Sequence, residues 1–302
     1  MSAEVLIQDT NITARDGYEL AATVFAPGTP PRAAVLVNSA TAVSRKIYRG
    51  FAAYLAERGG AAVTYDYRGI GGSRPRSLKG FDASMRDWAA LDVAAAIDHV
   101  HGVWPAVPLL MVGHSFGGQA LGLAPNNARV ARALFVAAQA GYWRLFAPPE
   151  NYRAYGLMRL IGVPVTHMLG YTPGRLGIGE DLPKGVFLEW TKWVGRPRYF
   201  FDDPTLDALA NFPRFTGDLR AIRIADDSWA TAPAVDMLLS GFTGARRERV
   251  EITPRDVGAK KIGHFGFFRP EHRETLWRGA ADWLLDCKGP RDPAEGRSES
   301  NR

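Results

Sequence analysis

Short apolar segments alternate with amphipathic segments through most of the chain. Four mostly apolar runs of strand length lie at residues 33–37, 61–65, 108–112 and 133–137. Such runs are typical of strands covered on both faces. Helical patterns follow the first three runs, at residues 47–58, 85–99 and 117–124. This order predicts a mostly parallel sheet with helices packed against it.

The two ends of the chain extend this sheet. Within the first 25 residues, alternating apolar positions on either side of Asp16-Gly17 predict a hairpin that adds an antiparallel edge. Towards the C-terminus we expect, in order, a strand at 221–225, a helix at 233–239, a strand at 249–252 and a helix at 271–286. The fold class is therefore α/β, with an eight-stranded, mostly parallel sheet flanked by helices.

One long stretch lacks the strand–helix rhythm. Residues 139–217 carry prolines and scattered aromatic residues, and an insertion of this kind is typical of a lid or cap. We expect residues 1–138 and 218–287 to form the core and residues 139–217 the cap. The polar stretch 288–302 is expected to be a disordered tail.

The sharpest local motif is Gly113-His114-Ser115-Phe116-Gly117, directly after a predicted strand and before a predicted helix. A serine at so tight a turn is held in a strained backbone conformation that exposes its hydroxyl. Glycines two residues before and after it remove side chains that would collide. The helix behind the turn directs free N–H groups towards a developing negative charge. This context predicts a nucleophilic serine rather than a plain glycine-rich turn.

With this motif, the chain resembles the α/β-hydrolase superfamily, and within it the monoglyceride-lipase and serine-aminopeptidase-like branch. Residues 65–73, Tyr-Asp-Tyr-Arg-Gly-Ile-Gly-Gly-Ser, are similar to a D-x-R-G-x-G-x-S loop of that superfamily. The resemblance implies that Arg68 and Ser73 serve the fold rather than the chemistry. It covers residues from about 5 to 286 and matches least in the cap region.

The resemblance also implies an acid after a late strand and a histidine before the last helix. Asp227 and His264 fill these two places, and the order Ser115, Asp227, His264 implies a catalytic triad. Asp226 is adjacent to Asp227 and remains an alternative acid, although the small and apolar residues after Asp227 favour it. His114, next to the serine, is interpreted as a packing residue.

An oxyanion hole is expected to combine two backbone N–H groups. Phe116, directly after the nucleophile, supplies the first. The second comes from the loop after residue 37, which reads Asn-Ser-Ala-Thr-Ala where many members of the superfamily have His-Gly. This departure leaves Ala40 and Thr41 as alternative donors.

Composition limits the partners. The net charge of +6 accompanies scattered basic residues, so we expect a solvated basic surface and no nucleic acid as a partner.

The single cysteine excludes an internal disulfide, and the N-terminus lacks the pattern of a signal peptide. No apolar window is long enough to span a membrane, so a cytoplasmic protein is expected. We expect no metal and no other cofactor, because no ligand spacing appears and Gly69-Ile70-Gly71-Gly72 lacks the dinucleotide fingerprint. The sequence leaves the oligomeric state open.

These features predict a serine hydrolase that acts on a carboxylic ester, thioester or lactone of a small molecule. An amide or peptide hydrolase, an acyltransferase with the same triad and a non-catalytic binding protein are the alternatives. Aromatic residues of the cap, among them Trp143, Trp190 and Trp193, are expected to line an apolar substrate pocket. On a helix, Trp190 and Trp193 would share a face.

Overall fold

The computed structural model describes residues 4–286. Its main sheet has eight strands in the order β1-β2-β4-β3-β5-β6-β9-β10. Their bounds are β1 Val5–Thr13, β2 Glu19–Pro27, β3 Ala33–Asn38, β4 Gly60–Tyr65, β5 Leu109–His114, β6 Val130–Val136, β9 Asp218–Ile224 and β10 Arg246–Ile252. The hairpin β1–β2 is antiparallel and forms one edge, and the remaining strands from β4 to β10 pair in parallel. The predicted sheet is confirmed, and the expected tail at 288–302 and Cys287 lie outside the described residues.

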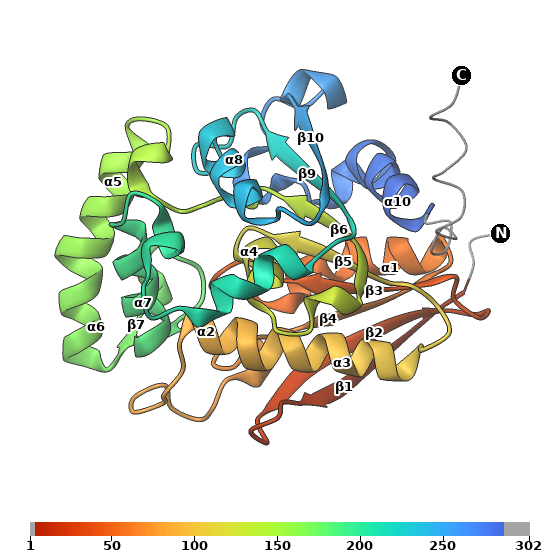
Figure 1. Ribbon diagram of the computed structural model, residues 1–302, viewed down its shortest axis with the longest axis horizontal. Coiled ribbons are helices and arrows are strands. Elements are labelled where there is room, and N and C mark those ends of the chain that lie inside the picture. Colours follow the sequence, from red (N-terminus) through yellow and green to blue (C-terminus); the bar gives the residue numbers. More distant parts are fainter. Residues whose placement is uncertain (1–3, 287–302) are drawn as a thin grey trace, which may run out of the picture.

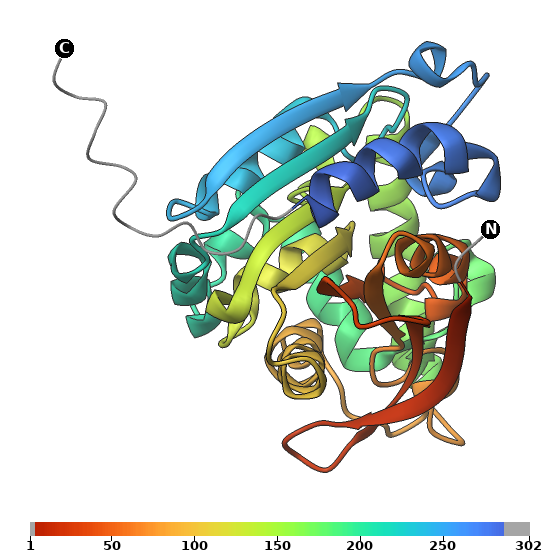
Figure 2. The ribbon, with the colours of Figure 1, turned by 90° about the vertical axis from the view of Figure 1, so that its right-hand side faces the viewer.

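Helices cover both faces of the sheet. On one face lie α1 (Arg49–Glu57) and α10 (Arg278–Leu285), and on the other lie α3 (Ala94–Val103), α4 (Phe116–Leu123) and α8 (Ala232–Gly241) (Figure 1, Figure 2). The central strands β3, β4 and β5 are buried at every position. This explains why their sequences are mostly apolar rather than alternating.

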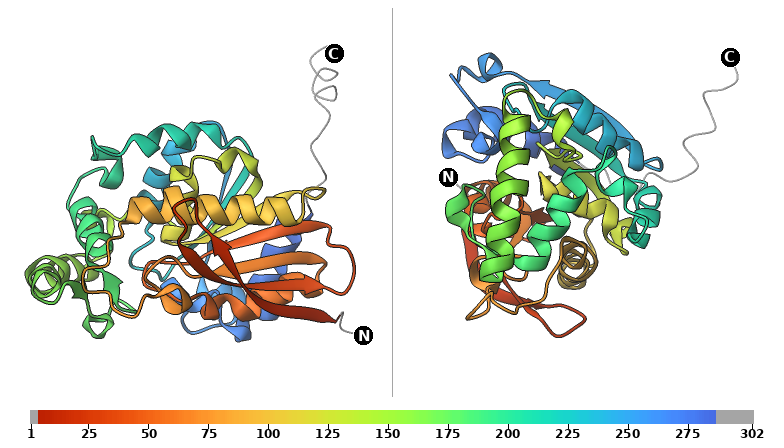
Figure 3. Two further views of the ribbon diagram at one scale, coloured as in Figure 1. Left: turned by 90° about the horizontal axis from the view of Figure 1, so that it is seen from below. Right: turned by 90° about the vertical axis from the view of Figure 1, so that its left-hand side faces the viewer.

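The segment between β6 and β9 is more regular than its sequence indicates. It contains α5 (Glu150–Gly156), α6 (Val163–Leu169), α7 (Lys184–Val194) and a small hairpin of β7 (Tyr171–Thr172) and β8 (Leu182–Pro183). Its helices gather at one end of the sheet (Figure 1, Figure 3). The buried residues of α7 recur at helical spacing, an amphipathic pattern that could have predicted this helix; they are Val186, Phe187, Trp190, Thr191, Trp193 and Val194.

The loop after β4 is held by buried polar contacts. The Arg68 guanidinium pairs with Asp92 (Nε to Oδ1, 2.7 Å) and with Asp16 (2.6 Å). The Ser73 hydroxyl donates to the Asp66 carbonyl (2.7 Å) and accepts from the Ala21 N–H (2.8 Å). These contacts join the loop to β2, to the turn between β1 and β2 and to the helical segment Trp88–Val93, as the structural interpretation of Arg68 and Ser73 requires.

A group of basic residues, Arg246, Arg247 and Arg249, lies on the edge strand β10, and each of their side chains has a bonding partner. Arg246 pairs with Asp218 (2.6 Å), Arg249 pairs with Asp236, and Arg247 donates to a backbone carbonyl. No helix among residues 4–286 is long and apolar enough to cross a membrane.

Candidate active site

Ser115 lies at the turn between β5 and α4, where its backbone is left-handed (φ 51°). This conformation is rare for a residue other than glycine and is strained. An added Cβ at Gly113 would collide with the backbone of Gly117 and Gly118, and one at Gly117 would collide with Asn38. The spacing of these glycines therefore has the steric cause that the sequence suggested. The Phe116 N–H, at the first position of α4, has no carbonyl within the helix to bond.

His264 and Asp227 meet across two loops. Asp227 follows β9, and His264 lies in α9 (Gly263–Gly266). The distance from His264 Nδ1 to Asp227 Oδ2 is 2.7 Å, and the second carboxylate oxygen of Asp227 accepts from the Trp229 N–H (2.8 Å). Burial raises the pKa of Asp227, but the charge of His264 and these hydrogen bonds outweigh it and hold the pKa below its usual value. The carboxylate is therefore ionised at neutral pH.

Asp226 faces elsewhere. Its two carboxylate oxygens accept from the backbone N–H groups of Ile262 (3.0 Å) and Gly263 (2.9 Å). These bonds hold the start of the segment that carries His264, and Gly263 there has a left-handed backbone (φ 64°). Asp227 thus contacts the imidazole, whereas Asp226 fixes the backbone in front of it.

His114 connects the two loops around the serine. The distance from its Nδ1 to the Tyr48 hydroxyl is 2.8 Å, and the distance from its Nε2 to the His264 carbonyl oxygen is 2.9 Å. Burial, helped by the nearby His264, lowers the pKa of His114 to about 3, so its ring is neutral. A neutral ring must donate from Nε2 to the carbonyl and accept at Nδ1 from Tyr48. His114 is therefore buried, as its interpretation as a packing residue implies, and it also makes two hydrogen bonds.

This network engages one of the two alternative oxyanion donors. The Ala40 N–H donates to the Tyr48 hydroxyl (2.9 Å). Tyr48 in turn donates to His114, so Ala40, Tyr48 and His114 form a chain. The Thr41 N–H is consequently the better candidate for the second donor, and Thr41 lies on the cavity wall.

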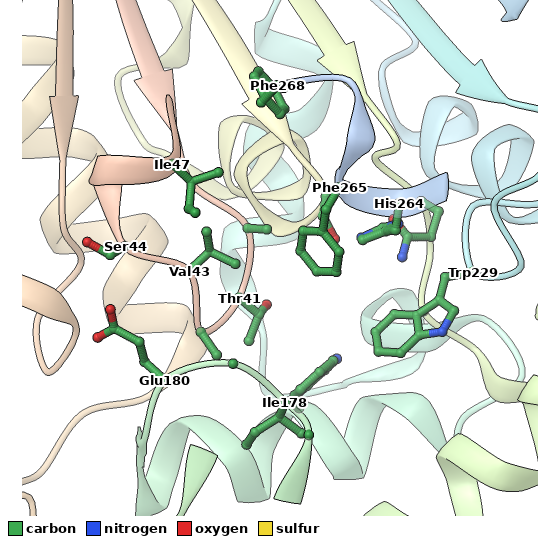
Figure 4. Close-up of a pocket in the computed structure, with 18 of the residues that line it drawn as sticks. Thr41, Val43, Ser44, Ile47, Ile178, Glu180, Trp229, His264, Phe265 and Phe268 are labelled. Carbon is green, nitrogen blue, oxygen red and sulfur yellow. The ribbon is translucent and has the colours of Figure 1, made fainter. Parts of the chain in front are cut away.

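Ser115 and His264 line the same cavity, whose volume is about 790 Å³. Figure 4 shows His264 and Trp229 on one side and Val43, Ser44 and Ile47 on the other. The wall of the cavity is mostly apolar. Its residues come mainly from the loop after β3, the segment between β6 and β9, and the loops after β9 and β10. The apolar lining includes Val43, Ile47, Phe146, Ile178, Trp190, Trp229, Phe265 and Phe268.

The three tryptophans expected to bind substrate have different positions. Trp190 lines the cavity. Trp193 does not: it is buried, packs against Phe200, and its indole N–H donates to Asp203 (2.8 Å). Trp143 also lies outside the cavity lining and stacks on Tyr155 instead. Trp190 and Trp193 are three positions apart on α7 and both are buried, as expected for a shared face, but only Trp190 reaches the cavity, because Trp193 packs against the neighbouring segment at 199–203.

Several lining residues were not singled out from the sequence. Trp229 lies beside His264 (ring centroids 5.5 Å apart) and stacks on Phe146 (5.6 Å). Gln119, Gln139 and Tyr199 also line the cavity. The position of Gln119, four residues after the serine on the same helix, was the one available signal. In the described part of the chain, no three His, Cys, Asp or Glu side chains are grouped closely enough to hold a metal ion.

Comparison with known proteins agrees with this architecture. A family model described as serine aminopeptidase, S33, matches residues 29–165, which include Ser115 but neither Asp227 nor His264. No curated protein matches the chain by sequence. Among solved structures, a soluble variant of monoglyceride lipase from Saccharomyces cerevisiae is 14% identical (TM-score 0.65), covering 94% of this chain and 95% of that one.

Two esterases of solved structure resemble this chain to a similar degree in identity, TM-score and coverage. The esterase of Exiguobacterium antarcticum is 15% identical, with a TM-score of 0.58 and coverage of 92% of this chain and 99% of that one. An esterase of Pyrococcus furiosus is 15% identical, with a TM-score of 0.61 and coverage of 95% and 93%. At such low identity these likenesses establish the fold and not the activity. The chain therefore has the α/β-hydrolase fold, and its residues 29–165 match the serine aminopeptidase family model.

Proposed function

We propose that the protein is a serine hydrolase that cleaves a carboxylic ester, thioester or lactone of a small, largely apolar molecule. The observation that carries the proposal is the bond from His264 Nδ1 to Asp227 (2.7 Å) on a histidine that shares a cavity with the strained Ser115. A serine at such a turn, a histidine and an ionised carboxylate that orients it are the three roles of an acyl-transfer triad.

In the proposed mechanism, the Ser115 hydroxyl attacks the substrate carbonyl while His264 Nε2 takes its proton. Asp227 keeps the imidazole proton on Nδ1 and stabilises the imidazolium that forms. The Phe116 N–H, together with the Thr41 N–H, stabilises the oxyanion. The imidazolium then returns its proton to the leaving group, and a water activated by His264 hydrolyses the acyl-enzyme.

The cavity favours a small apolar substrate over a polymer. Its volume of about 790 Å³ lies in the range of sites that enclose a small molecule, and aromatic and aliphatic side chains form most of its wall. The second candidate, an amide or peptide hydrolase, is favoured by the description of the matching family model.

Turnover of matched substrates separates these two candidates. We expect aryl esters with acyl chains of increasing length to be hydrolysed, and the matched anilides to react far more slowly. A lactone and a thioester complete the panel. Faster release of aniline than of phenol from matched substrates would favour the amide hydrolase. A chain that neither turns over any of them nor reacts with a fluorophosphonate would be a binding protein.

We further propose that residues 139–217 act as a cap that determines acyl specificity. Trp190, from α7 of this segment, lines the cavity that contains Ser115. Trp190→Ala should change the ratio of kcat/KM for long and short acyl chains, because one lost apolar contact is worth about 1–3 kcal/mol of discrimination. The measurement is the chain-length profile of aryl esters, with fluorophosphonate labelling of Ser115 retained.

Trp143→Ala is the matched control for this prediction. Trp143 belongs to the same segment but lies outside the cavity lining, where it stacks on Tyr155 (ring centroids 4.8 Å). Its replacement should leave the chain-length profile unchanged. Equal profiles for wild type and Trp190→Ala would refute the specificity role of the cap.

A further inference from the structure

Three buried polar atoms of the cavity lining have no hydrogen-bond partner among the described residues. They are Oε1 of Gln119, Oε1 of Gln139 and the hydroxyl of Tyr199. The exposed fractions of these residues are 3%, 3% and 0%. An unpaired polar atom in a protein interior costs about 1–3 kcal/mol, so three at one site need an explanation.

The two glutamines are positioned by their own contacts. Gln119 lies on α4, one turn beyond Ser115, and Gln139 follows the end of β6. The Gln119 Nε2 donates to the Gln139 backbone carbonyl (2.7 Å). Because only the amide nitrogen can donate to a carbonyl, this bond fixes the orientation of the Gln119 amide and leaves its Oε1 as a free acceptor.

Tyr199 comes from the segment between β6 and β9 and completes the group. Its backbone is left-handed (φ 57°), a strained conformation for a large side chain. Its ring packs on Gly141, where an added Cβ would lie 2.9 Å from the ring. Burial and the negative charge of Glu189 raise the pKa of Tyr199 well above its usual value, which the side chains of Trp190 and Gln119 offset only in part. The hydroxyl is therefore neutral and lies near the Gln119 amide.

We propose that Gln119, Gln139 and Tyr199 form a polar subsite that binds a neutral hydrogen-bonding group of the substrate, a hydroxyl or a carboxamide. The two amide oxygens accept hydrogen bonds, whereas the Tyr199 hydroxyl can donate or accept one, so a group that both donates and accepts is complementary. None of the three side chains is charged, and the nearby Glu189 is already paired with Arg86 (2.6 Å), so neither offers a free partner to neutralise an ionised group. This inference rests on the proposed function and narrows it: the substrate is an ester with a hydroxyl or amide group, and not a plain hydrocarbon ester.

The test uses matched esters that differ by one hydroxyl. One set comprises p-nitrophenyl ω-hydroxyalkanoates of four to eight carbons and the alkanoates in which a methyl replaces the hydroxyl. The other pair is 2-hydroxyethyl hexanoate and propyl hexanoate. For each pair, the ratio of kcat/KM for the hydroxylated to the methyl substrate is measured in wild type, Tyr199→Phe and Gln139→Met. We expect this ratio to fall about fivefold to tenfold in each variant for at least one pair, as one neutral hydrogen bond is lost.

Tyr54→Phe is the matched control. The Tyr54 hydroxyl accepts from Arg58 (3.0 Å) on α1, away from the cavity lining, so its removal should leave every ratio unchanged. The melting temperature of Tyr199→Phe should change little, because that hydroxyl makes no well-formed hydrogen bond and has only weaker polar contacts with Trp190 and Gln119. Unchanged ratios for all pairs in both Tyr199→Phe and Gln139→Met, with turnover of the methyl substrates retained, would overturn the subsite but leave the hydrolase intact.

Calorimetric titration separates the two proposals. The Ser115→Ala variant is titrated with 2-hydroxyethyl hexanoate, propyl hexanoate, and hexanoate esters with and without a terminal hydroxyl. A preference for a hydroxylated ligand that Tyr199→Phe removes would support the subsite even if no ester were hydrolysed. If the hydroxylated ligands did not bind more tightly than the others, the subsite would be refuted, whether or not the wild-type protein hydrolyses esters.

Discussion

Replacement of Ser115 by alanine is expected to abolish both fluorophosphonate labelling and ester turnover. The hydroxyl at this position is the proposed nucleophile, so no acyl-enzyme can form without it. Removal of the nucleophile from such a triad lowers kcat by about 10⁴-fold or more. Mass spectrometry of the labelled protein and initial rates with an aryl ester measure the two effects. The fold should persist, because alanine adds no atoms to the turn.

The control for this prediction is Ser240→Ala. Ser240 is exposed near the end of α8, and its hydroxyl bonds only the Met237 carbonyl (2.7 Å). This variant should label and turn over as wild type does. Persistent hydrolysis in Ser115→Ala, at a rate close to wild type, would show that another residue attacks the substrate and would refute the assignment of Ser115.

Replacement of Asp227 by asparagine is expected to have the second largest effect. The Asp227 carboxylate accepts from His264 Nδ1 (2.7 Å), and it is ionised because the charge of His264 and hydrogen bonds outweigh its burial. An asparagine turns an amide N–H towards the imidazole and stabilises the tautomer that cannot take a proton from Ser115. A loss of about 10⁴-fold in kcat at neutral pH is typical of such a replacement.

Asp226→Asn tests the same prediction from the neighbouring position. Its carboxylate accepts from the backbone of Ile262 and Gly263, and the asparagine oxygen can keep one of these bonds. We therefore expect a small loss of melting temperature and a decrease in kcat within about tenfold, the equivalent of about one hydrogen bond. If Asp226→Asn abolished turnover while Asp227→Asn retained it, the two roles would have to be exchanged.

Most of the fold could be predicted from the sequence because burial leaves a local signature. Strands β3, β4 and β5 are buried at every position, as is the second half of β6, and these sequences are mostly apolar. The segment between β6 and β9 is harder to recognise, because its helices are short and are separated by turns. Helix α7 does carry a helical period, since Phe187, Trp190 and Val194 recur on its buried side.

The candidate site was likewise predictable from the sequence only in part. The strained turn at Ser115 is local, because the glycines around it and the helix after it are all within a few residues. The chain order then pointed to Asp227 and His264 through the resemblance. Which aspartate contacts the imidazole depends on where the backbone of Ile262 and Gly263 lies, and those residues are 36 and 37 positions away from Asp226.

The sequence by itself thus determined the sheet, the position of the serine turn and a short set of candidate partners, since each depends on residues that are near neighbours in the chain. Only the tertiary structure decided which groups meet. The Tyr48 hydroxyl takes the Ala40 N–H, and the segment at 199–203 covers Trp193 while Trp190 stays in the cavity. Gln119, Gln139 and Tyr199 converge from a helix, a strand end and a distant loop. Such contacts join residues remote in sequence, and hydrogen-bond geometry selects among them only after the whole chain has packed.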